Sequence, residues 1–159
     1  MENPLLEIQE YDNLVQALKS GKGPLQVTGT LDSQKVHLMY ELGEASAFSW
    51  KLVVTYDDTR AKEIYDDLRS FTSRVWLYPA KDLLFYSADI HGNLMARQRI
   101  AVLRRLMEDR EGVVVTTMDG LMDHLLPLKY LREQSITVES GQVIDLDVWK
   151  ERLIAMGYE

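Results

Sequence analysis

The chain contains no cysteine, few prolines and no long apolar run. Of its 159 residues, Cys accounts for 0 and Pro for 4. The absence of cysteine excludes disulfides, iron–sulfur clusters, thiolate zinc sites and cysteine nucleophiles. No apolar run approaches the roughly 20 residues that a membrane span needs, and the segment Met1-Glu2-Asn3-Pro4 lacks the basic and apolar regions of a signal peptide. We therefore expect a cytoplasmic protein with no membrane contact.

Basic residues are also in the minority. Lys and Arg number 18 against 25 Asp and Glu, which gives a net charge of -7. Because binding to a phosphate backbone depends on clustered Lys and Arg, this balance argues against nucleic acid as the main partner. The hydrophobic share of 46% and the charged share of 27% are typical of a soluble globular protein.

Short β-rich runs alternate with helical patterns, which predicts an α/β fold with a parallel sheet flanked by helices. The predicted strands are Leu25–Val27, Lys51–Thr55, Arg74–Tyr78 and Val113–Thr116. The predicted helices are Ser33–Leu42, Thr59–Phe71, Leu94–Met107 and a short helix that Thr117 caps and that ends before Pro127. The last three strands show little alternation, as expected for strands buried on both faces.

The pattern changes near the C-terminal end. Ser135–Val138 is predicted to be a strand and Leu146–Met156 a helix that Gly157 ends. We place a domain boundary near Glu133, so that residues 1–133 form the α/β domain. Residues 134–159 are then expected to be the beginning of a second, truncated domain, because the predicted strand has no later strand to pair with.

The segment from Gln26 to Ser33 has the spacing of a phosphate-binding loop without the residues that bind phosphate. A functional loop reads G-x-x-x-x-G-K-[ST], where backbone N–H groups wrap the phosphates and the Lys reaches them. Here Gln26 and Leu31 replace the two glycines and Asp32 replaces the Lys. A carboxylate about 4 Å from a phosphate charge costs about 4 kcal/mol at an effective dielectric of about 20. Nucleotide affinity should therefore fall roughly a thousandfold.

We accordingly predict a degenerate phosphate loop that binds no cofactor. Its residues are Thr28, Gly29, Thr30, Asp32 and Ser33. The alternative is an ordinary strand-to-helix turn in which Asp32 or Thr30 caps the helix.

Two further positions carry charge where α/β folds often bind ligands. Asp57 and Asp58 follow a predicted strand, where dinucleotide-binding folds place an acid for the ribose, but helix capping is the favoured interpretation because no G-x-G-x-x-G is present. Arg99 falls on the apolar face of its helix, so we predict a structural ion pair with Asp82 or Asp89. An anion or partner contact is the alternative. On the same helix, Arg97 and Arg104 are expected on a solvated face, with Glu108 beside Arg104.

No arrangement typical of catalysis or metal binding is present, and we predict neither a catalytic residue nor a metal site. His37, His91 and His124 lie on separate elements without metal-ligand spacing. Asp119 and Asp123 with His124 are interpreted as a solvated helix face, with a weak metal cluster as the alternative. Ser87 lacks a G-x-S-x-G setting. The apolar run Leu83–Tyr86 is expected to pack under the sheet edge or, alternatively, to form an exposed contact patch.

Several segments occur in one order that matches a known pattern. They are Val27-Thr28-Gly29-Thr30, Tyr78-Pro79-Ala80, Tyr86…Gln98-Arg99-Ile100-Ala101-Val102-Leu103, Val113-Val114-Val115-Thr116-Thr117, Leu125-Leu126-Pro127 and Ile136-Thr137-Val138…Gly141…Gly157-Tyr158. In this order they resemble the N-terminus of bacterial transcription-repair coupling factors (Mfd), over nearly the whole chain.

The resemblance implies a module related to the repair protein UvrB, whose first domain has the Walker loop V-T-G-S-G-K-T. Leu31 and Asp32 stand where that loop has its essential Gly and Lys. UvrB also has a long aromatic β-hairpin that clamps DNA, whereas this chain has only the short connection Ala80–Asn93. The resemblance therefore implies a P-loop-like scaffold without nucleotide use or strand clamping.

In that family the second domain recruits UvrA, and other domains use ATP and Mg²⁺, bind RNA polymerase and translocate on DNA. The resemblance places the UvrA contacts after Glu159, so none is assigned to a residue here. We expect a non-catalytic, protein-binding module. The alternatives are a nucleotide- or small-ligand-binding domain that uses the carboxyl ends of the strands, or an enzyme of unrecognised type with Asp57, Asp58 or His91 at that edge.

Overall fold

The computed structural model describes residues 5, 8–46, 48–80, 89–125, 127–133, 135–136, 138 and 140–155. Its elements are α1 (Gln9–Lys19), α2 (Asp32–Ala45), β1 (Trp50–Thr55), α3 (Asp58–Leu68), β2 (Val75–Tyr78), α4 (Asp89–Glu108), β3 (Gly112–Thr117), α5 (Met118–Met122), α6 (Leu128–Glu133) and α7 (Leu146–Ala155). The chain divides into two compact units, Met1–Asp123 and His124–Glu159. The second unit contains α6 and α7.

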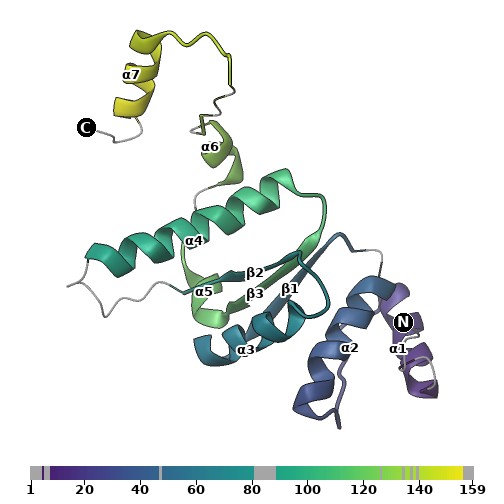
Figure 1. The fold of residues 1–159 in the computed structure, drawn as a ribbon. Coiled ribbons are helices and arrows are strands. Elements are labelled where there is room, and N and C mark those ends of the chain that lie inside the picture. Colours follow the sequence, from purple (N-terminus) through teal and green to yellow (C-terminus); the bar gives the residue numbers. More distant parts are fainter. Residues whose placement is uncertain are drawn as a thin grey trace. The chain divides into compact units, whose positions relative to one another are not determined.

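The first unit is built on a three-stranded parallel sheet with the order β1-β3-β2. In its register Trp50 is opposite Gly112, and Val75 is opposite Val113. Parallel neighbours require crossovers, and helices supply them. Helices α3 and α4 lie on opposite faces of this sheet (Figure 1). The α/β fold with a parallel sheet flanked by helices is thus confirmed.

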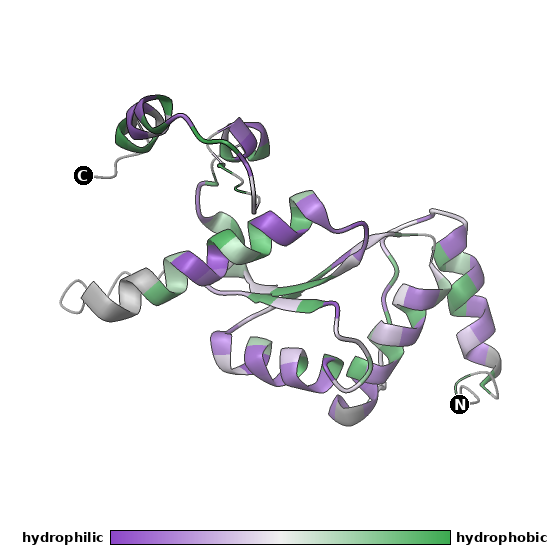
Figure 2. Ribbon diagram, turned by 45° about the horizontal axis from the view of Figure 1, so that its top comes forward, coloured by the Kyte–Doolittle hydropathy of each residue, from purple (hydrophilic) through white to green (hydrophobic). Residues whose placement is uncertain are grey.

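The core lies between the sheet and α2 and α3. Its buried residues are Val36, Ala61, Ile64, Leu68, Val75 and Val115, and Val53, Leu77 and Val113 pack partly buried against them. These strand residues alternate along β1, β2 and β3, so one face of every strand points into this core. Figure 2 shows hydrophobic colouring in the middle of the sheet, whereas the helices carry both hydrophilic and hydrophobic residues.

The opposite face is covered over β2 and β3 by α4. Tyr78, Val114 and Thr116 are buried there, as are Val102 and Leu103 of the helix. The Oγ1 of Thr116 donates to the carbonyl oxygen of Tyr78 at 2.8 Å, which joins the carboxyl ends of β3 and β2. This end of the sheet is the usual location of binding sites in parallel α/β folds.

Two of the predicted strands are wrong. Residues 22–31 contain no strand, and Leu25 and Val27 remain about half exposed. This segment does not join the sheet, because no described strand lies beside it to pair with its backbone N–H and C=O groups. In the other predicted strand, Ser135–Val138, residues 135, 136 and 138 lie outside any strand, and residue 137 lies outside the described residues.

The remaining three predicted strands and the helices α2, α3, α4, α5 and α7 are confirmed, with shifts at their ends, of which the largest is that α4 begins at Asp89 and not at Leu94. Two caps are also as predicted. Asp57 Oδ1 accepts a hydrogen bond from the backbone N–H of Arg60 at 2.7 Å, and Thr117 Oγ1 accepts one from Gly120 at 3.2 Å. The predicted domain boundary near Glu133 stays a prediction, because a division into compact units does not define domains.

None of the helices in the described ranges combines the length and the apolar composition that crossing a membrane requires.

Candidate functional site

The loop before α2 leads into the helix without a preceding strand, whereas a phosphate-binding loop connects a strand of the sheet to a helix. Gly29 has a φ of +82°, in the left-handed region that favours glycine. Leu31 is the N-cap, with φ -74° and ψ 155°. Its side chain has no acceptor, and its backbone N–H donates to Oε1 of Gln34 at 3.4 Å. The interpretation of Asp32 or Thr30 as the cap is therefore wrong, because Leu31 occupies the cap position.

Asp32 is the first residue of α2, and its charge is compensated by two cations. Its Oδ1 lies 2.8 Å from Nζ of Lys35 and 3.6 Å from Nη2 of Arg60. The hydrogen bond and the charge of Lys35, followed by the charge of Arg60, lower the pKa of this carboxyl. A carboxylate is also favourable at the positive end of a helix dipole. The position that a phosphate would occupy at this helix start therefore already holds a negative charge.

A groove of about 590 Å³ lies beside this loop. It is lined by Tyr11 and Leu14 of α1, by Val27 and Thr28 of the loop, and by His37 of α2, among others. No Lys or Arg occurs among the described residues that line it. Its volume falls within the about 300–1,000 Å³ of small-molecule sites, but no cation is available there to bind a phosphate. The side chain of Ser33 lies outside the described part of the structure.

Arg99 forms a structural ion pair at the carboxyl end of the sheet, as predicted, but the described partner is not one of the two predicted residues. Arg99 is 6% exposed. Its Nη1 lies 2.8 Å from Oδ2 of Asp123 and donates to the carbonyl oxygen of Pro79, also at 2.8 Å. The partner is Asp123, which follows α5. Asp82 and the side chain of Asp89, the two predicted partners, lie outside the described part of the structure.

The guanidinium of Arg99 also covers the ring of Tyr78, with 4.4 Å between its carbon and the ring centroid. Among the residues that the structure describes, the hydroxyl of Tyr78 is buried without a hydrogen-bond partner. Burial raises the pKa of Tyr78, although the charge of Arg99 acts in the opposite direction. Through these contacts Arg99, which belongs to α4, connects the end of β2 with the end of α5. Because Asp123 compensates its charge, the geometry favours a structural role over anion binding.

In the part of the chain that the structure describes, the remaining candidates do not come together as a site. Among the described residues no group of three or more His, Asp or Glu could hold a metal ion. His37 Nε2 lies 3.5 Å from Oε1 of Glu41, and its ring stacks on Phe71. Arg104 Nε lies 2.7 Å from Oε1 of Glu108, as predicted. The side chain of His91, together with Ser87 and Leu83–Tyr86, lies outside the described residues.

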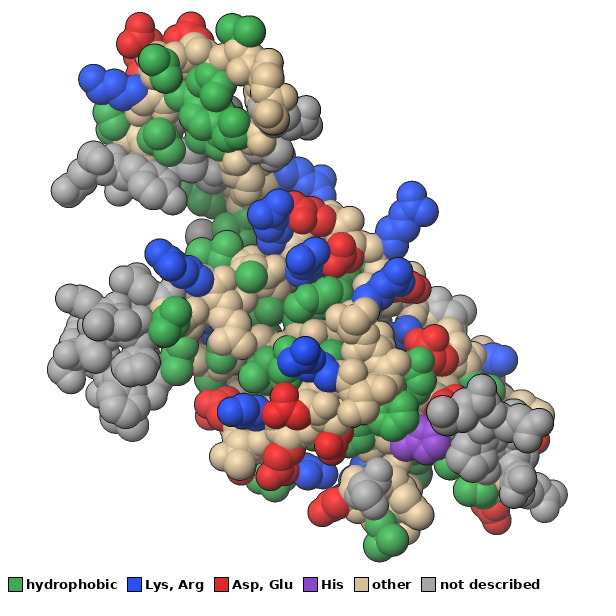
Figure 3. All heavy atoms as spheres, in the orientation of Figure 1, with side chains coloured by type: hydrophobic (Ala, Val, Ile, Leu, Met, Phe, Trp, Pro, Cys, Tyr) green, Lys and Arg blue, Asp and Glu red, His purple; other side chains and the backbone are tan. Residues whose placement is uncertain are grey.

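Charge on the visible face is mixed. Figure 3 shows Lys and Arg side chains interspersed with Asp and Glu, without one large basic patch. This agrees with the overall excess of acidic residues.

No family model matches the chain. Curated relatives do match the chain, and they include transcription-repair-coupling factors. The transcription-repair-coupling factor of Staphylococcus aureus (strain USA300) is 26% identical over 159 residues, which is 98% of this chain and 14% of the relative. That of Staphylococcus epidermidis (strain ATCC 12228 / FDA PCI 1200) is 26% identical over 151 residues, 92% of this chain and 13% of the relative. The chain is similar to the N-terminal region of transcription-repair-coupling factors.

This similarity confirms the resemblance found in the sequence. The chain spans about 14% of the length of the S. aureus relative.

Proposed function

We propose that this chain is a non-catalytic, protein-binding module of a transcription-repair-coupling factor and acts in transcription-coupled nucleotide-excision repair. The observation that carries the proposal is the similarity to such factors over 98% of the chain. The geometry supports a role without nucleotide chemistry. The carboxylate of Asp32 at the start of α2 would repel a phosphate, and the adjacent groove has no Lys or Arg among its described residues to attract one.

The loop that begins at Gln26 is, on this proposal, a degenerate phosphate loop in a UvrB-like domain. The parent protein would be an ATP-dependent DNA translocase whose motor domains use ATP and Mg²⁺. RNA polymerase and DNA would bind to other domains of that parent. The present chain would contribute a scaffold and a surface for other proteins.

The first test is nucleotide binding. Millimolar ATP with Mg²⁺ is expected to leave the melting temperature unchanged within about 1 °C, because a ligand that does not bind the native state cannot stabilise it. Differential scanning fluorimetry measures this. The double variant Leu31→Gly, Asp32→Lys restores the missing loop residues and is expected to show no ATP hydrolysis in residues 1–159, since hydrolysis would require the motor domains proposed for the parent. A rise of several degrees with ATP, or turnover in the double variant, would contradict the proposal.

A small uncharged ligand in the groove beside Val27 is the second candidate function. It is favoured by one observation, the volume of about 590 Å³ with a largely apolar lining. Adenosine in the same melting experiment separates the two candidates. Stabilisation by adenosine but not by ATP would support a ligand site that excludes phosphate, whereas no effect of either supports the scaffold role.

The second test concerns UvrA. We propose that UvrA binds mainly through the domain that begins near Ser135, with its contacting residues after Glu159. Isothermal titration calorimetry of this chain with UvrA is therefore expected to show weak or no binding, while a polypeptide extended through the whole second domain binds. Tight binding by residues 1–159 alone would place the contact before Glu159 and contradict this assignment.

A further inference from the structure

Helix α5 connects the first unit to the second, and its apolar side chains contribute little to holding it on the sheet. Of its 5 residues, all of which the structure describes, only Gly120 is buried. The apolar side chains are exposed, by 56% at Met118, 43% at Leu121 and 77% at Met122. The first unit ends directly after this helix, at Asp123. Because apolar burial is the main source of docking free energy, α5 must be held in another way.

Polar and close backbone contacts of the described residues attach α5 at three points. At its start, Thr117 Oγ1 of β3 accepts a hydrogen bond from the backbone N–H of Gly120 at 3.2 Å. After its end, Oδ2 of Asp123 lies 2.8 Å from Nη1 of Arg99 on α4. Between them, Gly120 lies so close to Thr116 that a Cβ on Gly120 would be 2.5 Å from Thr116 Oγ1. Each of these contacts requires α5 to sit in one exact position.

We propose that α5 is a latch, which can detach from the sheet while the sheet stays folded. Segments with few buried apolar contacts open at free energies below that of global unfolding. Detachment frees residues 118–123, so the link to the second unit then begins after Thr117 and not after Asp123. The freed residues span up to about 20 Å when extended. The latch therefore sets how far the second unit can reach from the sheet.

The reach of the second unit matters for any partner that this unit binds. The effective concentration of a tethered module depends on the length of its link. With the latch closed, the second unit leaves the first at one fixed point, which the pair of Arg99 and Asp123 defines. With the latch open, the same unit samples a larger volume without any change in the sheet.

Hydrogen exchange of the unchanged chain tests whether α5 opens by itself. The amides of residues 120–122 are expected to be protected at least about tenfold less than those of residues 113–116 in β3, because they exchange through detachment of α5. Low concentrations of urea should accelerate exchange in β3 alone, since detachment exposes little new surface. Equal protection and equal urea dependence of the two segments would overturn the proposal, because α5 would then open only together with the sheet.

Gly120→Ala is designed to hold the latch open. Alanine is a better helix former than glycine, so the helix itself is not weakened. The added Cβ, however, collides with Thr116 Oγ1, which is fixed by its hydrogen bond to the carbonyl oxygen of Tyr78 at 2.8 Å. Exchange in residues 121–122 should come within about tenfold of the unprotected rate, while β3 stays protected at least about a hundredfold. Gly43→Ala in α2 is the matched control and should leave α5 protected.

Asp123→Asn tests the ion pair by removing the charge opposite Arg99, and it should release α5 in the same way. Glu108→Gln is the matched control, because it makes the same chemical change in the exposed pair with Arg104. Exposed pairs contribute little, so this control should change the protection of α5 by less than about twofold. Continued protection of α5 in both Gly120→Ala and Asp123→Asn would contradict the proposal, as would loss of protection in β3 to the unprotected rate.

The longer reach has its own measurement. Since the chain has Cys 0, Asp66→Cys in α3 and Lys150→Cys in α7 introduce two thiols at exposed positions for spin labels. Double electron–electron resonance between the labels should give a wider distance distribution when Gly120→Ala is added, and the same distribution when Gly43→Ala is added. An unchanged distribution in the Gly120→Ala variant would mean that α5 does not control the reach of the second unit, and the proposal would be wrong.

Discussion

Replacing Arg99 by Met is expected to lower the free energy of unfolding by about 3 kcal/mol, as is typical when one partner of a buried ion pair is removed. Met retains most of the apolar volume, so the loss reports on the guanidinium. Without it, Asp123 loses its cation at 2.8 Å and the carbonyl oxygen of Pro79 loses its donor. The ring of Tyr78 loses its covering charge as well. Urea denaturation, followed by circular dichroism, measures the change.

Arg104→Met on the same helix is the matched control. Arg104 Nε lies 2.7 Å from Oε1 of Glu108, a geometry as close as that of Arg99, but the two side chains are 68% and 48% exposed. Exposed ion pairs contribute about 0–1 kcal/mol. The two variants should therefore differ by about 2 kcal/mol or more. Equal effects would mean that the contacts of Arg99 do not hold α4 and α5 on the sheet.

The sheet was predictable where side-chain type and burial agree. Strands β1, β2 and β3 are runs of Val, Leu, Trp, Tyr and Thr, and helix α3 has apolar residues at helical spacing behind a cap at Asp57. These signals are local, so they can be read from the sequence. They also imply the flanked parallel sheet, because strands that alternate with helices are parallel when crossovers connect them.

The wrong predictions of secondary structure occur where a segment's conformation depends on residues that are distant in the sequence. Leu25–Val27 has strand-like composition, but a strand exists only with a neighbour, and here the apolar side chain of Val27 lines the groove with α1 and α2. Helix α1 was not predicted at all. Tyr11, Leu14, Val15 and Leu18 have the helical spacing i, i+3, i+4 and i+7 that would have indicated it.

At the candidate site, too, some features follow from the local sequence and others depend on the tertiary fold. The charge of Asp32 in place of a Lys is a property of the sequence and predicts poor phosphate binding. That Lys35 and Arg60 compensate this charge depends on α2 and α3 being adjacent. The helical position of Arg99 predicted a buried ion pair, but its partner follows from where α5 ends, which is a property of the tertiary fold.

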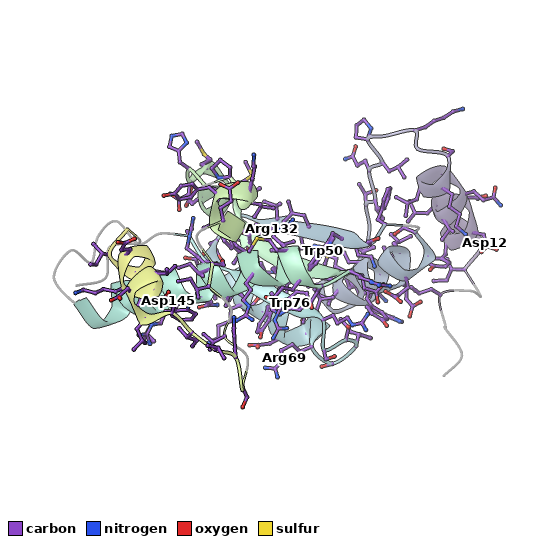
Figure 4. The ribbon with its side chains drawn as sticks, turned by 90° about the horizontal axis from the view of Figure 1, so that it is seen from above. Asp12, Trp50, Arg69, Trp76, Arg132 and Asp145 are labelled. Carbon is purple, nitrogen blue, oxygen red and sulfur yellow. The ribbon has the colours of Figure 1, made fainter. Side chains whose placement is uncertain are left out.

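Gly112→Ala is expected to destabilise the sheet by about 2 kcal/mol, within the about 1–3 kcal/mol typical of overpacking. Gly112 begins β3 beside the indole rings of Trp50 and Trp76, whose centroids are 5.6 Å apart at an interplanar angle of 42°. A Cβ on Gly112 would lie 2.9 Å from Cζ3 of Trp50 and even closer to the ring of Trp76. Trp50 belongs to β1 and Trp76 to β2, and both are labelled in Figure 4, so relieving the clash requires the indole rings or the neighbouring strands to move.

Gly43→Ala is the control for this prediction. Gly43 lies inside α2, where the nearest atom to an added Cβ is the flexible Lys51 side chain, at 3.4 Å. Alanine in a helix is favoured over glycine by about 1 kcal/mol, so this variant should be stabilised. Urea denaturation of both variants, with tryptophan fluorescence as the probe, tests the opposite signs. If Gly112→Ala were neutral, the indole rings could move apart without cost, and the close packing of Trp50 and Trp76 would not fix the spacing of the strands.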